Sequence, residues 1–173
     1  MKFPIHSDFL ESVRIEGGGL APATIQRVSD RLAPSLDFSS PRLIIRVRPT
    51  SPIVVGSLIK YQGARFLMAA HAATDDYRSF WAFEATRLAS WQTIVKTTDA
   101  LTGLEKSAAK STGVPIWVGW EIMTRQPYER QIGVSNEVTR VMTAADVQLN
   151  DIIDGQQVKR VNHSLGLNIA EVS

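Results

Sequence analysis

The chain has 173 residues, of which 44% are hydrophobic and 21% are charged, and this composition is typical of one folded domain, alone or with an extension. It contains no cysteine, which excludes disulfide scaffolds, thiolate metal sites and cysteine nucleophiles. The formal net charge of +2 is too small to indicate binding of nucleic acid or anionic membranes mainly through charge.

The first 40 residues are predicted to form an extended N-terminal arm and one short helix. Three consecutive glycines at 17–19 break any regular structure in the arm. Residues 21–33 predict the helix, because Pro22 suits a first helical turn and Pro34 ends the segment. Its apolar stripe would be Ile25, Val28 and Leu32. No continuous apolar segment resembles a signal peptide or a membrane span, so we expect a soluble protein made in the cytoplasm.

The remaining residues, 41–173, are predicted to form a small β-barrel or sandwich. Short β-prone segments alternate with turn residues, and closure of the sheet would remove exposed strand edges. Residues 99–113 are polar and small, and we predict that they form a long mobile loop, one of one or two in the domain. The strands are expected at 43–48, 53–61, 64–71, 77–86, 91–97, 114–123 and 137–142, followed by a closing meander.

The closing meander, residues 146–173, is the clearest part of the predicted fold. Asp154 and Gly155 lie between apolar runs, and Asp-Gly is a strong signal for a two-residue type I′ hairpin turn. Leu165 and Gly166 indicate a second turn before the last strand. Asp154, Gly155 and Gly166 are therefore the residues predicted to define the turns.

No cluster of residues predicts catalysis, a metal or a cofactor. His71 lies near Asp75 and Asp76 and could form a metal or acid–base site, but no second histidine is close in sequence. We interpret this group as structural. Ser57 follows Gly56 but lacks the second glycine of a nucleophile elbow, and no pair of carboxylates is placed together by the sequence. The chain is therefore predicted not to be an enzyme.

Aromatic residues are the best candidates for contacts with another molecule. Trp81, Phe83, Trp117 and Trp120 leave large apolar groups on both faces of their strands. Such residues could stack on the bases of a single-stranded nucleic acid, but the low net charge favours a contact with a partner protein. Lys106 and Lys110 are further candidates, because they lie in the predicted loop 99–113.

Two segments carry a resemblance to a known family. Residues 54–68, VVGSLIKYQGARFLM, and the closing meander, DVQLNDIIDGQQVKRVNHSLGLNIAEVS, resemble the head–tail connector proteins of tailed bacteriophages, in particular head-closure (stopper) and neck proteins. The resemblance extends from about residue 54 to the end, and residues 1–40 have no counterpart in it.

The resemblance implies a β-barrel subunit that assembles into a homo-oligomeric ring at the head–tail junction of the virion. Its partners would be the portal or adaptor protein on one side and tail-terminator or tail proteins on the other. A long loop would help to retain packaged DNA, with non-specific contacts only. The family offers no catalytic residue or cofactor. A tail-terminator or minor tail protein, and a single-stranded nucleic-acid-binding barrel, remain the alternatives.

Overall fold

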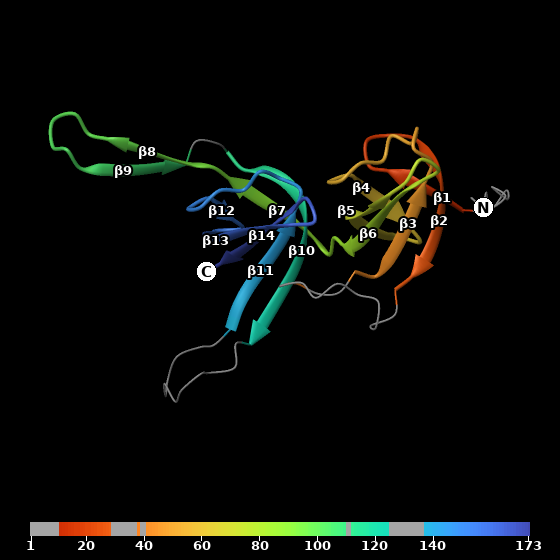
Figure 1. Ribbon diagram of the computed structural model, residues 1–173. Helices are drawn as coiled ribbons and strands as arrows, with labels where there is room; N and C mark the ends of the chain where they lie inside the picture. Colours follow the sequence, from red (N-terminus) through yellow and green to blue (C-terminus); the bar gives the residue numbers. More distant parts are fainter. Residues whose placement is uncertain (1–10, 29–37, 39–40, 110–111, 125–136) are drawn as a thin grey trace.

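The protein is described from a computed structural model, which describes residues 11–28, 38, 41–109, 112–124 and 137–173. The described part is built from β-strands, β1 to β14, and contains no helix. The strands form two closed six-stranded barrels and a separate two-stranded ribbon (Figure 1). The prediction of a mainly β protein with a barrel is confirmed, but the chain contains two barrels where the sequence predicted one.

Barrel 1 comes from the N-terminal half, with the strand order β1-β2-β3-β6-β5-β4. It closes where β1 pairs antiparallel with β4, through Arg14 opposite Lys60 and Ile15 opposite Ile59. Its strands are β1 (Glu11–Ile15), β2 (Leu20–Arg27), β3 (Leu43–Val47), β4 (Leu58–Tyr61), β5 (Ala64–Ala73) and β6 (Arg78–Glu84).

Barrel 2 comes from the C-terminal half, with the order β10-β11-β14-β13-β12-β7. It closes where β7 pairs with both β10 and β12. Its strands are β7 (Arg87–Gln92), β10 (Val114–Thr124), β11 (Glu137–Thr143), β12 (Ile152–Ile153), β13 (Gln156–Ser164) and β14 (Leu167–Val172).

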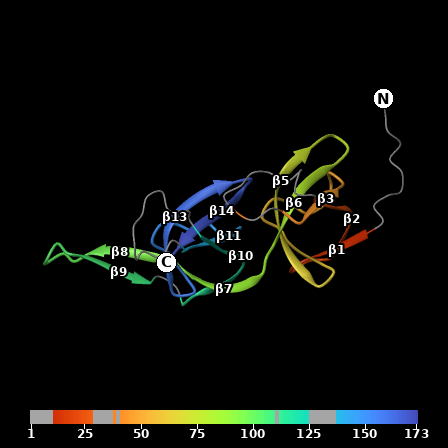
Figure 2. The same ribbon diagram turned by 90° about the horizontal axis from the view of Figure 1, so that it is seen from below.

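The ribbon consists of β8 (Ile94–Thr98) and β9 (Glu105–Ala109), which pair only with each other. It leaves barrel 2 on the side away from barrel 1, and both views show it projecting from the molecule (Figures 1 and 2).

Alternation along the strands fills the interior of each barrel. In β3, Ile45 and Val47 point into barrel 1, whereas Ile44 points outward. In β14, Ala170 and Val172 point into barrel 2, whereas Ile169 points outward. The outward side chains are also buried, because the walls of the two barrels pack against each other.

The contact between the barrels is a third apolar core, which we call the inter-barrel cluster. Its buried members are Phe38, Ile44, Leu67, Ala69, Trp81, Phe83, Ala85, Met142, Leu167 and Ile169. A backbone hydrogen bond of 2.8 Å from Ala70 N to Leu165 O also joins the two barrels. Strands that are apolar on both faces are thus explained within a single chain.

The predicted N-terminal helix is wrong. Residues 20–27 form β2, and β1 and β2 are strands of barrel 1 and not parts of an arm; residues 29–33 of the predicted helix lie outside the described residues. Ala21 and Ala23 are buried in barrel 1, with Ile25 packed beside them. Residues 21, 23 and 25 thus follow the two-residue alternation of a strand. Alanine suits a narrow barrel interior because it is small, but it is only weakly apolar, so this alternation is hard to recognise in the sequence.

The prediction of one long loop over 99–113 is wrong where the chain forms the second strand of the ribbon, whereas residues 99–104 form the connection between the two ribbon strands. Residues 105–109 form β9, and the connecting turn is ordered by Asp99. Its Oδ1 accepts hydrogen bonds from Leu101 N at 2.9 Å and Thr102 N at 3.2 Å. The small and polar residues of β9, EKSAA, show no apolar alternation, so the sequence does not indicate a strand there. Residues 110 and 111 lie outside the described residues.

The predicted turns are confirmed. Asp154 and Gly155 have φ angles of 48° and 80°, and Leu165 and Gly166 have φ angles of 51° and 79°. Positive φ at both central residues is the signature of a type I′ turn, whose twist matches that of the flanking strands. The two glycines differ in their surroundings. A Cβ at Gly155 would meet nothing, whereas a Cβ at Gly166 would overlap Val55 Cγ1.

We therefore predict that Gly155→Ala lowers the free energy of unfolding by about 1–2 kcal/mol, the penalty for a Cβ in this backbone region. Gly166→Ala should lower it by more, because the new methyl group also clashes with Val55. Denaturant unfolding would measure both values. The double variant Gly166→Ala/Val55→Ala separates the two effects, and it should recover part of the loss. Equal losses for the two single variants would contradict the steric explanation.

Candidate functional site

Two of the four predicted aromatic contacts lie inside the molecule. Trp81 and Phe83 point outward from β6 of barrel 1, yet they are only 8% and 2% exposed. They pack in the inter-barrel cluster with Leu167 and Ile169 of β14. The partner surface that these aromatics indicated is therefore the wall of the second barrel of the same chain.

The other two tryptophans are each covered by an arginine. The Arg65 guanidinium carbon lies 4.1 Å from the ring centre of Trp117, and this contact joins β5 of barrel 1 to β10 of barrel 2. The Arg87 guanidinium carbon lies 4.3 Å from the ring centre of Trp120. Both distances are typical of cation–π contacts, so both rings have a partner within the chain.

The structure describes the strand position of one of the two lysine candidates. Lys106 lies on β9, opposite Thr97 of β8. Lys110 lies outside the described residues.

Asp154 has a second role that the sequence did not indicate. Its Oδ1 accepts a hydrogen bond of 2.7 Å from Ser90 N, and its Oδ2 forms a 2.6 Å ion pair with Arg87. Its own N–H donates to Ser90 O at 2.8 Å. The turn residue thus fastens β12 to β7 and closes barrel 2.

Asp151 is a structural anchor that sequence reasoning missed. It is 3% exposed, and its carboxylate accepts hydrogen bonds from Trp91 Nε1 at 2.9 Å, Gln148 N at 2.8 Å and Ile94 N at 3.3 Å. Trp91 lies in β7 and Ile94 begins β8, so Asp151 holds the root of the ribbon against barrel 2. Its place beside the apolar pair Ile152–Ile153 was the available signal for a buried role.

His71 forms a local network at the end of β5. Its Nδ1 lies 2.6 Å from Ser79 Oγ, and its ring meets the Trp81 ring edge-on, with the ring centres 4.3 Å apart. Partial burial of the ring holds the pKa of His71 below its usual value of 6.5, and the positive charge of Arg46 lowers it further. This arrangement agrees with the structural interpretation of His71.

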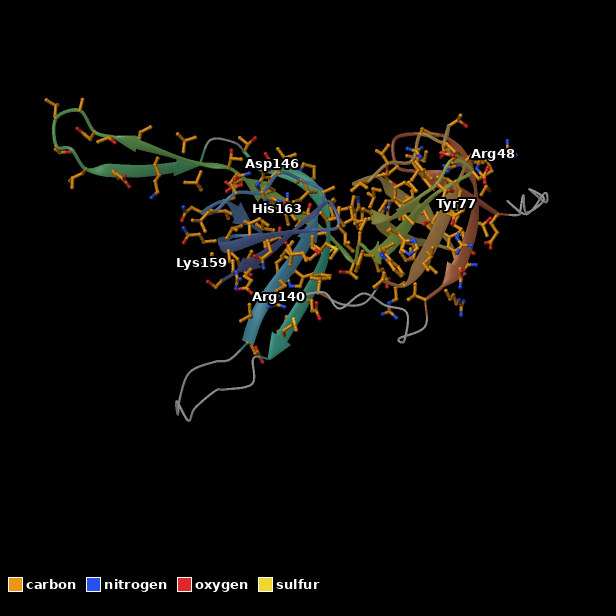
Figure 3. The ribbon with its side chains drawn as sticks, viewed as in Figure 1. Arg48, Tyr77, Arg140, Asp146, Lys159 and His163 are labelled. Carbon is orange, nitrogen blue, oxygen red and sulfur yellow. The ribbon has the colours of Figure 1, made fainter. Side chains whose placement is uncertain are left out.

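Arg140, labelled in Figure 3, forms an ion pair on barrel 2. Arg140 on β11 donates from Nε and Nη2 to Glu171 Oε1 on β14, at 3.3 and 3.1 Å, and both side chains are largely buried. In the strand register, Glu121 is opposite Arg140 and Arg160 is opposite Glu171. Glu121, Arg140, Glu171 and Arg160 therefore form a row of alternating charge across β10, β11, β14 and β13. Opposite charges on neighbouring strands stabilise the pairing of those strands.

One hollow in the described part of barrel 1 lies at the ends of its strands and has a volume of about 440 Å³. Two polar contacts join side chains that line it. Arg42 lies 3.7 Å from Glu84, and Tyr61 donates a short hydrogen bond to Glu11. This hydrogen bond raises the pKa of Tyr61 above 10.0.

The second hollow, which we call the β5 pocket, has a volume of about 550 Å³. Its floor is the exposed end of β5, where small side chains leave the strand uncovered. The residues around it are Val54, Val55, Ala70, His71, Ala72, Ala73, Arg78, Ser79 and Phe80.

The described residues contain no group of three or more His, Asp or Glu side chains that could hold a metal ion. They also include no helix long and apolar enough to cross a bilayer. No family model, curated protein or solved structure matches the chain.

We predict that Trp81→Ala lowers the free energy of unfolding by about 3–5 kcal/mol, because it removes a large ring from the inter-barrel cluster. Leu88→Ala is the matched control, since Leu88 is 52% exposed and its truncation should change stability by less than about 0.5 kcal/mol. Chemical denaturation monitored by circular dichroism would measure both. Similar losses for the two variants would show that the barrels do not depend on this contact.

We also predict that His71 makes stability pH-dependent below pH 6.5. The unfolded chain takes up a proton on His71 as the pH falls through 6.5, whereas the folded chain, with its lowered pKa, does not. Stability contributed by the neutral ring is therefore complete above that pH and declines as the pH falls. Thermal unfolding of His71→Gln between pH 7.5 and 5 should show a shallower decline than that of the unchanged chain. Parallel curves would exclude this role.

Proposed function

We propose that the protein is a structural subunit of a tailed bacteriophage, forming a homo-oligomeric ring at the head–tail junction. The ring would join the portal or adaptor to the tail and help to retain packaged DNA. The proposal is supported by the family resemblance of residues 54–68 and 146–173, and by a mainly β architecture.

The exposed apolar tip of the ribbon is the observation that best supports a structural role. Leu101 and Leu104 at its turn are 97% and 65% exposed, although large apolar side chains on a projecting tip are costly to leave in water. An isolated two-stranded hairpin is marginally stable, so a ribbon of this kind is best explained by a partner that covers it.

Closed barrels support the same role. In the described residues, the barrel strands pair on both sides, which leaves the ribbon as the sheet with open edges. A subunit built this way has one place for strand-edge contacts and resists uncontrolled association elsewhere.

A tail-terminator or minor tail protein remains the alternative within the same class, because each would also assemble through projecting segments. A single-stranded nucleic-acid-binding barrel is less well supported. Trp81 and Phe83 are buried between the barrels, and Trp117 and Trp120 are covered by arginines. Base stacking would need exposed rings.

We predict that the protein is present in purified virions and lies between portal and tail. Mass spectrometry of the particles and reconstruction of the head–tail junction would measure this. Deletion of its gene should leave DNA-filled heads and free tails that do not join. Complementation with the unchanged gene is the control. A position against the end of the tail tube would indicate a tail terminator, and absence from the virion would overturn the proposal.

A further inference from the structure

The tip of the ribbon presents a compact apolar surface beside the carboxylate of Asp99. The turn from Thr98 to Glu105 contains Leu101 and Leu104, both strongly exposed, together with Asp99 and no cationic residue. The Asp99 side chain shapes this turn by accepting hydrogen bonds from the backbone. The two leucines are thus held on a preformed turn, which reduces the entropy lost when they bind.

The β5 pocket presents the complementary chemistry. Val54 and Val55 are exposed at its rim, and alanines form its floor. Arg78 lines it with a buried Nε that has no hydrogen-bond partner in the described structure. A volume of about 550 Å³ is large enough for two leucine side chains.

Charge gives the pocket one favourable side. Arg78 lines it, donates from Nη2 to Ser51 O and keeps a buried Nε with no partner in the described structure. At the tip, Glu105 pairs with Lys96 at 3.4 Å, so the excess negative charge of the turn comes from Asp99. The neighbouring β5–β6 turn contains Asp75 and Asp76, so Asp99 of an incoming tip would approach on the Arg78 side.

The ribbon cannot reach the β5 pocket of its own chain. The pocket is lined by residues of β5, β6 and the segment before β4, all in barrel 1, whereas the ribbon projects from barrel 2 away from barrel 1 in both views (Figures 1 and 2). A contact between the two features therefore requires a second copy of the chain.

We propose that the ribbon tip of one subunit docks into the β5 pocket of a neighbouring copy, with Leu101 and Leu104 as its anchors. The two surfaces are different, so the contact is heterologous, and each subunit retains a free tip and a free pocket for the next copy. Repetition with closure gives a ring. The inference rests on the homo-oligomeric part of the proposed function and names the contact that would build the ring.

The absence of cysteine in the chain allows a direct test by disulfide trapping. The double variant Leu104→Cys/Val54→Cys places one thiol on the tip and one at the pocket rim. Under mild oxidation we expect covalent dimers, trimers and longer species on a non-reducing gel, because a disulfide forms only when the two Cα atoms approach within about 7 Å. Each single-cysteine variant can form dimers at most.

The matched control is Leu20→Cys/Val54→Cys. Leu20 is as exposed as Leu104 but lies on the β1–β2 side of barrel 1, so random collisions should be similar and specific trapping should be lost. A ladder of similar yield in this control would overturn the proposal.

Light scattering on cysteine-free variants provides the second measurement. Leu101→Asp should weaken self-association by at least about tenfold, whereas Leu20→Asp should leave it unchanged. Oligomers that persist in Leu101→Asp, with no ladder in the double-cysteine variant, would overturn this contact and leave the proposed ring intact. A protein that stays monomeric and forms no ladder also overturns the contact, and the position of the protein in the virion then decides the proposed function separately.

Discussion

The apolar contact between the barrels is the interaction on which the rest of the structure depends. Each barrel wall buries one set of side chains inside and a second set against its neighbour. Trp81 and Phe83 from barrel 1 meet Leu167 and Ile169 from barrel 2, and Arg65 covers Trp117 across the same boundary. Two small barrels, each with a limited core, thereby gain a shared third core. This contact fixes the side of the molecule from which the ribbon projects.

The ribbon is rooted by polar groups, in contrast to the apolar packing that joins the barrels. Asp151 accepts hydrogen bonds from both sides of the β7–β8 junction, and Asp154 fastens the neighbouring turn to Ser90 and Arg87. Buried carboxylates with several donors are strongly directional. These hydrogen bonds and the ion pair hold the base of the ribbon against barrel 2, and the ribbon in turn positions the exposed leucines at its tip.

Parts of this arrangement could be predicted from local sequence. The Asp154-Gly155 turn was evident because a type I′ turn has a narrow chemical requirement that these residues meet. Strand β2 was misassigned as a helix because Ala21 and Ala23 give weak apolar alternation, and Pro22 with Ile25 also fits a helical pattern. The second strand of the ribbon is not evident from the sequence, because its small and polar residues, EKSAA, show no apolar alternation. The candidate contact residues Trp81 and Phe83 were recognised as unusual, but their partner was not.

Residue types and near neighbours are enough to establish that the protein is mainly β, where several of its hairpins turn, and that it has no thiol chemistry. The division into two barrels, the packing of Trp81 and Phe83 against the wall of barrel 2, and the projection of the ribbon away from barrel 1 are visible only in the folded chain (Figure 1). Strands far apart in sequence, such as β6 and β14, meet through side-chain shape and burial, and this long-range packing leaves no local pattern in the chain.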